Sequence, residues 1–91
     1  MAIISSFQMI DPKHMAESLH AVREKLDSIE GETILDFSSV RRIDAKTLGV
    51  MEELAGVADN RAVRIALRGT NVGVYKVLKL VKLAPRFVFL T

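Results

Sequence analysis

The chain has 91 residues, of which 49% are hydrophobic and 26% are charged, so we expect one globular domain spanning residues 1–91 and exclude a disordered chain. It contains no cysteine, which excludes disulfides and thiol chemistry. No segment has the pattern of a signal peptide or the length of a membrane span, so we expect a cytoplasmic protein without membrane insertion.

Charge is distributed unevenly along the chain. Residues 1–60 hold six basic residues and all eleven acidic ones, whereas residues 61–91 hold seven basic residues and no acidic residue. A basic segment of this kind is typical of chains that bind an acidic protein, a nucleic acid or a membrane surface.

The first half of the chain predicts a strand, a helix and a second strand. Residues 2–10 are β-compatible and end at Asp11–Pro12, a pair that favours a helix start with Asp11 as N-cap. Apolar residues at steps of three and four then predict an amphipathic helix that ends at Gly31; these are Met15, Leu19, Val22, Leu26 and Ile29. Residues 33–37 predict a second strand and residues 38–43 a polar loop.

The second half continues the alternation. Asp44 is expected to cap a helix that ends near Asp59–Asn60, and the wide apolar arc of this helix predicts that part of it faces a partner. Residues 63–68 predict a strand, 69–71 a turn, 72–82 a helix and 86–90 a last strand. The inward side chains expected on that helix are Val74, Val77, Leu78 and Val81. This order predicts an α/β fold, with one mostly parallel or mixed sheet of about four strands and helices packed on it.

Patterns typical of catalysis or metal binding are weak. His14 and His20 are six residues apart on the first helix and lie on different faces, so we expect surface histidines. Glu52 and Glu53 diverge on a helix, and residues 69–73 match no phosphate-loop pattern. We therefore expect no metal site, no cofactor and no enzymatic activity.

Lys76, Lys79 and Lys82 recur every three residues on the third predicted helix. A basic face is what phosphate binding requires, so nucleic-acid binding is one alternative function. Single-strand binders also use exposed aromatic residues, and this segment offers only Tyr75. The simpler interpretation is a solvated helix face.

The segment Ile34–Val40, followed by Ile43–Asp44 and Leu48–Val50, resembles the STAS domain, a family named for sulfate transporters and anti-sigma factor antagonists. In that family a strand ends in LD(L/F)S and the next helix begins with (I/M)DSSGLG. The resemblance spans about residues 3–90, with further matches at Leu67–Asn71, Val77–Leu78, Leu83 and Phe87. It implies a small α/β domain that binds proteins and does not catalyse a reaction.

The resemblance also implies a regulatory switch, which this chain lacks in its usual form. Bacterial members bind an anti-sigma factor that is also a kinase, and this kinase phosphorylates the residue after the motif's aspartate. That position is Ala45 here, Lys46 replaces the second hydroxyl residue, and Thr47 replaces a glycine. Two alternatives stay open: a binder that is never phosphorylated, which we prefer, or an acceptor displaced to Thr47, Ser38 or Ser39.

We therefore expect a regulatory protein-binding domain that acts in transcription or signalling. Its partner surface would be the loop and the start of the second helix: Ser38, Ser39, Asp44, Ala45, Lys46, Thr47, Val50, Met51 and Asn71. Gly49 is expected to let this helix pack closely on the sheet. A role as accessory subunit of a lipid or anion transporter, which other family members have, stays open as a second function.

The beginning of the chain is a second departure from the family. STAS domains usually open with two strands, and only one fits before Asp11. We expect an uncovered sheet edge, which favours pairing of two copies of the chain.

Overall fold

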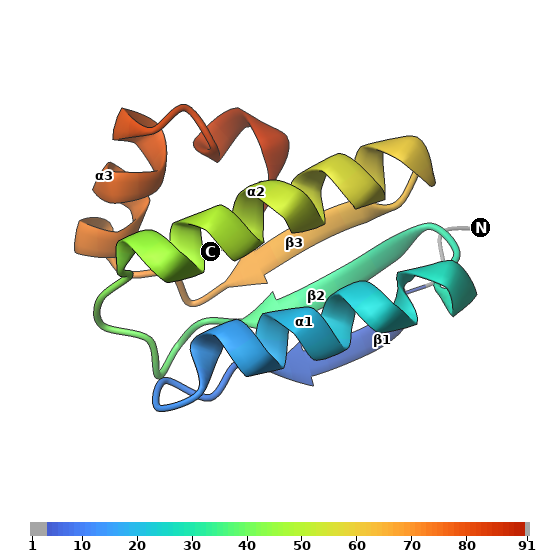
Figure 1. The fold of residues 1–91 in the computed structure, drawn as a ribbon, viewed down its shortest axis with the longest axis horizontal. Coiled ribbons are helices and arrows are strands. Elements are labelled where there is room, and N and C mark those ends of the chain that lie inside the picture. Colours follow the sequence, from blue (N-terminus) through green and yellow to red (C-terminus); the bar gives the residue numbers. More distant parts are fainter. Residues whose placement is uncertain (1–3, 91) are drawn as a thin grey trace.

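The computed structural model describes residues 4–90, in which four strands alternate with three α-helices (Figure 1). The elements are β1 (Ile4–Met9), α1 (Met15–Lys25), β2 (Glu32–Asp36), α2 (Ala45–Asn60), β3 (Arg64–Arg68), α3 (Val72–Leu80) and β4 (Val88–Leu90). Two 3₁₀ helices follow α1 and α3, namely η1 (Leu26–Ser28) and η2 (Ala84–Arg86). This alternation confirms the predicted α/β fold.

The four strands form one sheet in the order β1-β2-β3-β4, and all three neighbouring pairs are parallel. Within residues 4–90 the sheet is therefore wholly parallel and not mixed. Successive right-handed crossovers in this order place the connecting helices on one face, and Figure 1 shows α1 and α2 side by side over that face. The loops that follow β2 and β3 consequently meet at the same end of the sheet.

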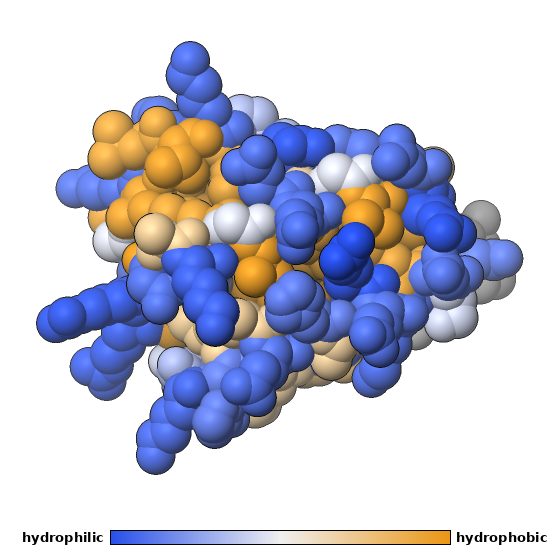
Figure 2. All heavy atoms as spheres, in the orientation of Figure 1, coloured by the Kyte–Doolittle hydropathy of each residue, from blue (hydrophilic) through white to orange (hydrophobic). Residues whose placement is uncertain are grey.

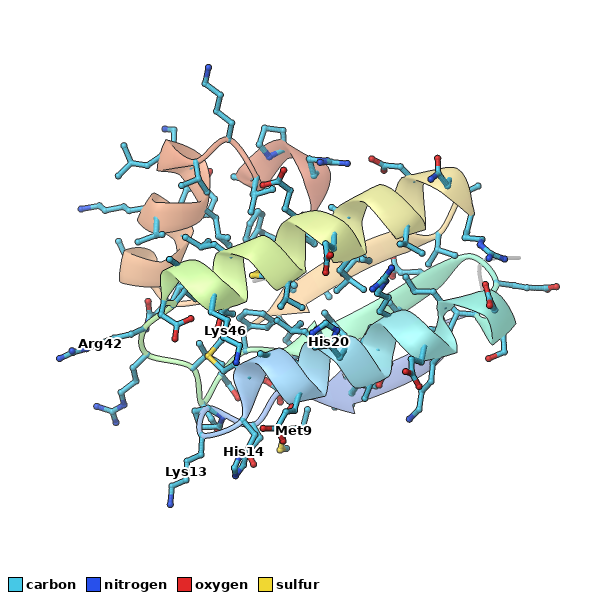
Figure 3. All side chains as sticks on the ribbon, in the orientation of Figure 1. Met9, Lys13, His14, His20, Arg42 and Lys46 are labelled. Carbon is cyan, nitrogen blue, oxygen red and sulfur yellow. The ribbon has the colours of Figure 1, made fainter. Side chains whose placement is uncertain are left out.

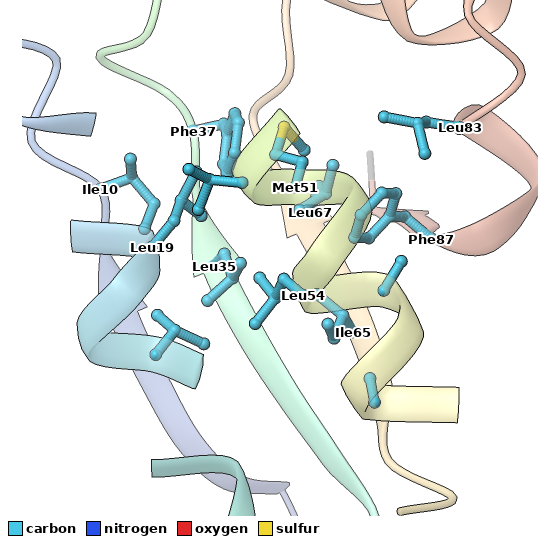
Figure 4. Close-up of a cluster of buried hydrophobic side chains, with 14 of the residues drawn as sticks. Ile10, Leu19, Leu35, Phe37, Met51, Leu54, Ile65, Leu67, Leu83 and Phe87 are labelled. Carbon is cyan, nitrogen blue, oxygen red and sulfur yellow. The ribbon is translucent and has the colours of Figure 1, made fainter. Parts of the chain in front are cut away.

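The hydrophobic core lies between α1, α2 and the sheet (Figure 4). It is built by the helix stripes and by alternate strand residues, which point to the same face of a sheet. The side chains labelled in Figure 4 are all buried: Ile10, Leu19, Leu35, Phe37, Met51, Leu54, Ile65, Leu67, Leu83 and Phe87. This core holds α2 against the face of the sheet, with the start of α2 at the carboxyl ends of the strands (Figure 1).

The first helix begins later than the sequence predicts. The Asp11 carboxylate accepts a hydrogen bond from the Lys13 N–H (2.9 Å), and the Asp11 carbonyl accepts one from the His14 N–H (3.0 Å). These bonds close a turn, so Asp11 is not the N-cap and α1 starts at Met15 after His14. The expected first strand is observed as Ile4–Met9, and residues 2 and 3 lie outside the described residues.

The third helix ends earlier than predicted, at Leu80, because the chain turns at Lys82 with a φ of 64°. The Leu83 N–H bonds the Leu78 carbonyl (2.8 Å), and the Lys82 N–H bonds the Lys79 carbonyl (3.1 Å). This is a Schellman ending, in which glycine usually occupies the position of Lys82. The expected inward orientation of Val81 is therefore wrong: its side chain is exposed. The 3₁₀ turn η2 also delays the last strand, which begins at Val88.

Candidate functional site

The start of α2 lies at the carboxyl end of the sheet and confirms the predicted cap. The Asp44 carboxylate accepts a hydrogen bond from the Thr47 N–H (2.8 Å) while Asp44 itself keeps extended backbone geometry. Hydrogen bonds from the hydroxyl and the backbone N–H of Thr47 hold the pKa of the Asp44 carboxyl below its usual value. The cap therefore carries a negative charge at neutral pH, next to the positive end of the helix dipole.

The loop between β2 and α2, residues 38–43, is held by a hydrogen bond at its first residue, Ser38. The Asp36 carboxylate accepts a hydrogen bond from the Ser38 N–H (2.8 Å), and hydrogen bonds from Ser38 lower the pKa of Asp36, with a smaller contribution from Arg68. Gly69 lies directly against this turn, because a Cβ placed on it would be 2.8 Å from the Ser38 Cβ. Its φ of 72° is also the left-handed conformation that glycine adopts without strain. Gly69 thus lets the loops after β2 and β3 touch.

Asn71 ties the same two loops together by hydrogen bonds. Its side-chain oxygen caps α3 by accepting from the Val74 N–H (2.7 Å). Its Nδ2 donates to the carbonyls of Val40 (3.3 Å) and Arg41 (3.4 Å). The predicted contact residue Asn71 therefore has a structural task, which is to hold the Ser38–Ile43 loop against α3.

The structure exposes one part of the predicted partner surface and buries another. Ser38, Ser39, Asp44, Ala45 and Lys46 are exposed at the same end of the molecule. The remaining predicted residues on α2 face the core: Thr47 is 3% exposed, Val50 7% and Met51 0%. We therefore remove these three from the contact surface, and burial also removes Thr47 as a substitute acceptor for a kinase.

Gly49 does not mediate the close packing that the sequence suggested. It is exposed, and a Cβ placed on it would meet nothing within 4 Å. A glycine inside a helix costs about 1 kcal/mol relative to alanine, and no contact within the described residues offsets this cost. Ala45 and Gly49, one turn apart, leave the helix backbone open to approach from outside.

A polar cleft of about 290 Å³ adjoins this surface, between the starts of α1 and α2. Its lining includes three cationic side chains, Lys13, Arg42 and Lys46, and two carboxylates, Glu17 and Asp44. His14 also lines the cleft, with its Nδ1 3.7 Å from the Glu17 Oε1. Figure 3 shows Lys13, His14, Arg42 and Lys46 at this end of the molecule. Arg42 ends the loop 38–42 that the sequence placed in the partner surface, whereas Lys13 was not predicted, because only the packing of α1 beside α2 brings it to the site.

The histidines, acidic residues and lysines considered for metal, membrane or nucleic-acid binding do not form a second site with this surface. His20 is exposed on α1, and no group of three His, Cys, Asp or Glu side chains within residues 4–90 could hold a metal ion. None of the helices in that range is long and apolar enough to cross a bilayer. The basic residues Lys76, Lys79 and Lys82 are exposed at and just beyond α3.

Comparison with known proteins agrees with this architecture. The solution structure of TM1081 has a TM-score of 0.77 and 21% identity, over 99% of this chain and 77% of that one. A crystal structure described as that of a proposed anti-sigma factor antagonist, TM1081 from Thermotoga maritima, has a TM-score of 0.65 and 22% identity, over 96% and 74% of the two chains. No curated protein sequence matches. Residues 13–91 match the model of the STAS domain, and the chain belongs to that family.

Proposed function

We propose that this STAS domain is a non-enzymatic regulator that binds a protein partner, in the manner of an anti-sigma factor antagonist, and that its binding is not switched off by phosphorylation at the start of α2. The observation that supports this most directly is the exposed first turn of α2, where Ala45 stands at the family's acceptor position. An alanine carries no hydroxyl for a kinase. The domain would therefore keep its binding-competent form permanently.

The proposed contact surface has three parts. The first is the exposed helix backbone at Ala45 and Gly49. A partner's side chains can approach this backbone closely, because neither residue has a side chain larger than a methyl group. The second is the loop with Ser38 and Ser39. The third is the cleft, where three cations exceed the two carboxylates of Glu17 and Asp44 and leave a positive excess that suits an acidic side chain of the partner.

Position 45 offers a test that leaves the fold intact. A carboxylate in the first turn of a helix interacts favourably with the helix dipole, so Ala45→Asp should keep or raise the stability of the domain. The same negative charge would face the partner, as the phosphate does in phosphorylated members of the family. Ala21→Asp is the matched control, because Ala21 is exposed on α1 and lies outside the proposed surface.

The experiment is a calorimetric titration of the chain with the kinase-type anti-sigma factor of the same organism. We expect binding by the native chain, at least tenfold weaker binding by Ala45→Asp, and unchanged binding by Ala21→Asp. Mass spectrometry after incubation with the factor and ATP should find no phosphate on the native chain and phosphate on residue 45 of Ala45→Ser. Equal affinity of the two aspartate variants would refute the surface, and phosphate on Ser38 or Ser39 of the native chain would refute the unswitched state.

A further inference from the structure

The outward face of α3 exposes aliphatic side chains. Val72 and Leu80 are 69% and 81% exposed, and their eight-residue spacing places them about 80° apart around the helix axis. Tyr75, on the same helix, and Val81, just after it, are also exposed. Figure 2 shows the result as a hydrophobic area over α3. We call Val72, Tyr75, Leu80 and Val81 the α3 patch.

Lysines are interleaved with the α3 patch. Lys76 is four residues from both Val72 and Leu80 on α3, and Lys79 and Lys82 line the same cleft as Tyr75. None of the ion pairs among residues 4–90 involves these three lysines. Residues 61–91 contain no acidic side chain that could neutralise them. Within the described residues, the charges of these three lysines are therefore not neutralised by an ion pair.

An apolar cleft of about 400 Å³ continues the α3 patch toward β4. It is lined by Ala84, Pro85 and Phe89, and by Tyr75, whose ring lies edge-on to that of Phe89 at a centroid distance of 5.0 Å. Lys79 and Lys82 also line it. Hydrocarbon against the apolar lining and an anionic group near the two lysines would satisfy both kinds of side chain.

We propose that the α3 patch and its lysines dock the domain peripherally onto an anionic lipid bilayer, with Leu80 reaching below the head groups. Lysines that surround exposed aliphatic residues are typical of helices that lie in a membrane interface, where the cations meet anionic head groups. Protein interfaces are instead depleted in lysine at their cores. Nucleic-acid surfaces that bind single strands expose aromatic rings for stacking, and here Tyr75 packs against Phe89.

The chain contains no tryptophan, so single-tryptophan variants report on this docking directly. We choose Leu80→Trp in the α3 patch and, as control, Met9→Trp at another exposed apolar position, 69% exposed on β1. With vesicles of equal parts phosphatidylglycerol and phosphatidylcholine, the emission of Leu80→Trp should shift to shorter wavelength and that of Met9→Trp should not. Vesicles of phosphatidylcholine alone should shift neither.

Charge variants separate this face from general electrostatic attraction. Each lysine near an anionic surface contributes a factor of about five to binding. Reversing two charges in Lys76→Glu/Lys79→Glu should therefore weaken co-sedimentation with the anionic vesicles by at least about 25-fold. The control Lys25→Glu/Arg64→Glu changes the net charge equally on exposed positions outside both proposed surfaces and should retain most of the binding.

Three outcomes would overturn the proposal: no co-sedimentation of the native chain, equal losses in both charge variants, or duplex DNA bound more tightly than the anionic vesicles. The test is independent of the proposed partner surface, because Ala45→Asp should bind vesicles as well as the native chain does. Failure of either proposal therefore leaves the other standing.

Discussion

The contact between Gly69 and Ser38 makes a quantitative prediction about how the site is held. In Gly69→Ala, the left-handed φ of 72° costs about 1–2 kcal/mol for a residue with a Cβ. The new Cβ would also stand 2.8 Å from the Ser38 Cβ and 3.0 Å from the Ser38 Cα, so the loop must shift, at a typical cost of about 1–3 kcal/mol. Lower chain entropy in the unfolded state returns about 0.4–1 kcal/mol. The free energy of unfolding should thus fall by about 1–4.6 kcal/mol.

Gly49→Ala is the matched control, because a Cβ there meets nothing within 4 Å and the residue lies inside α2. It should raise the free energy of unfolding by about 1 kcal/mol. Urea unfolding followed by far-UV circular dichroism gives both values, provided that the transitions are two-state with equal m-values. An unchanged midpoint for Gly69→Ala, or a comparable loss in both variants, would refute the inferred contact between the loops.

The remaining predictions concern the cap, a helix end and acid. Asn71→Asp keeps an oxygen acceptor for α3 but loses the Nδ2 donor to the Val40 carbonyl. Amides of residues 38–43 should therefore exchange faster in this variant while the amides of α3 stay protected. In Asn71→Ala the amides of both segments should exchange faster. Ala62→Gly, at a φ of 56°, should raise the free energy of unfolding by up to about 1 kcal/mol in urea melts. Because the pKa of Asp44 is lowered in the folded chain, its carboxylate stabilises the fold above about pH 4, the pKa in the unfolded chain. This stabilisation should disappear as the pH falls through the folded pKa, so the free energy of unfolding should depend less on pH in Asp44→Asn.

Local patterns in the sequence predicted most of the elements. The alternation of strands and helices, the loop at residues 38–43 and the Asp44 cap all depend on neighbours within a few positions, and the structure confirms them. The end of α2 was also predicted correctly, near Asn60. The end of α3 was harder to place, because Lys82 occupies the position with positive φ at which a glycine normally marks such an ending.

The partner surface was predicted only in part, since burial depends on contacts that are distant in sequence. The wide apolar arc of α2 gave no indication of which side α1 and the sheet would cover, so Val50 and Met51 were placed on the surface although they lie in the core. The cleft escaped prediction for the same reason, because it joins Lys13 before α1 to Lys46 on α2. The exposure of Gly49 could not be predicted either, because it depends on which side of α2 packs against the sheet.

The proposed docking surface for another protein is formed by the loop after β2 and the first turn of α2. Its most direct test is hydrogen exchange of the chain, alone and saturated with the anti-sigma factor proposed as its partner. Docking there should slow exchange for amides of residues 38–49 in the complex, with amides of α3 unchanged. Unchanged exchange over residues 38–49, combined with protection elsewhere on the chain, would contradict it.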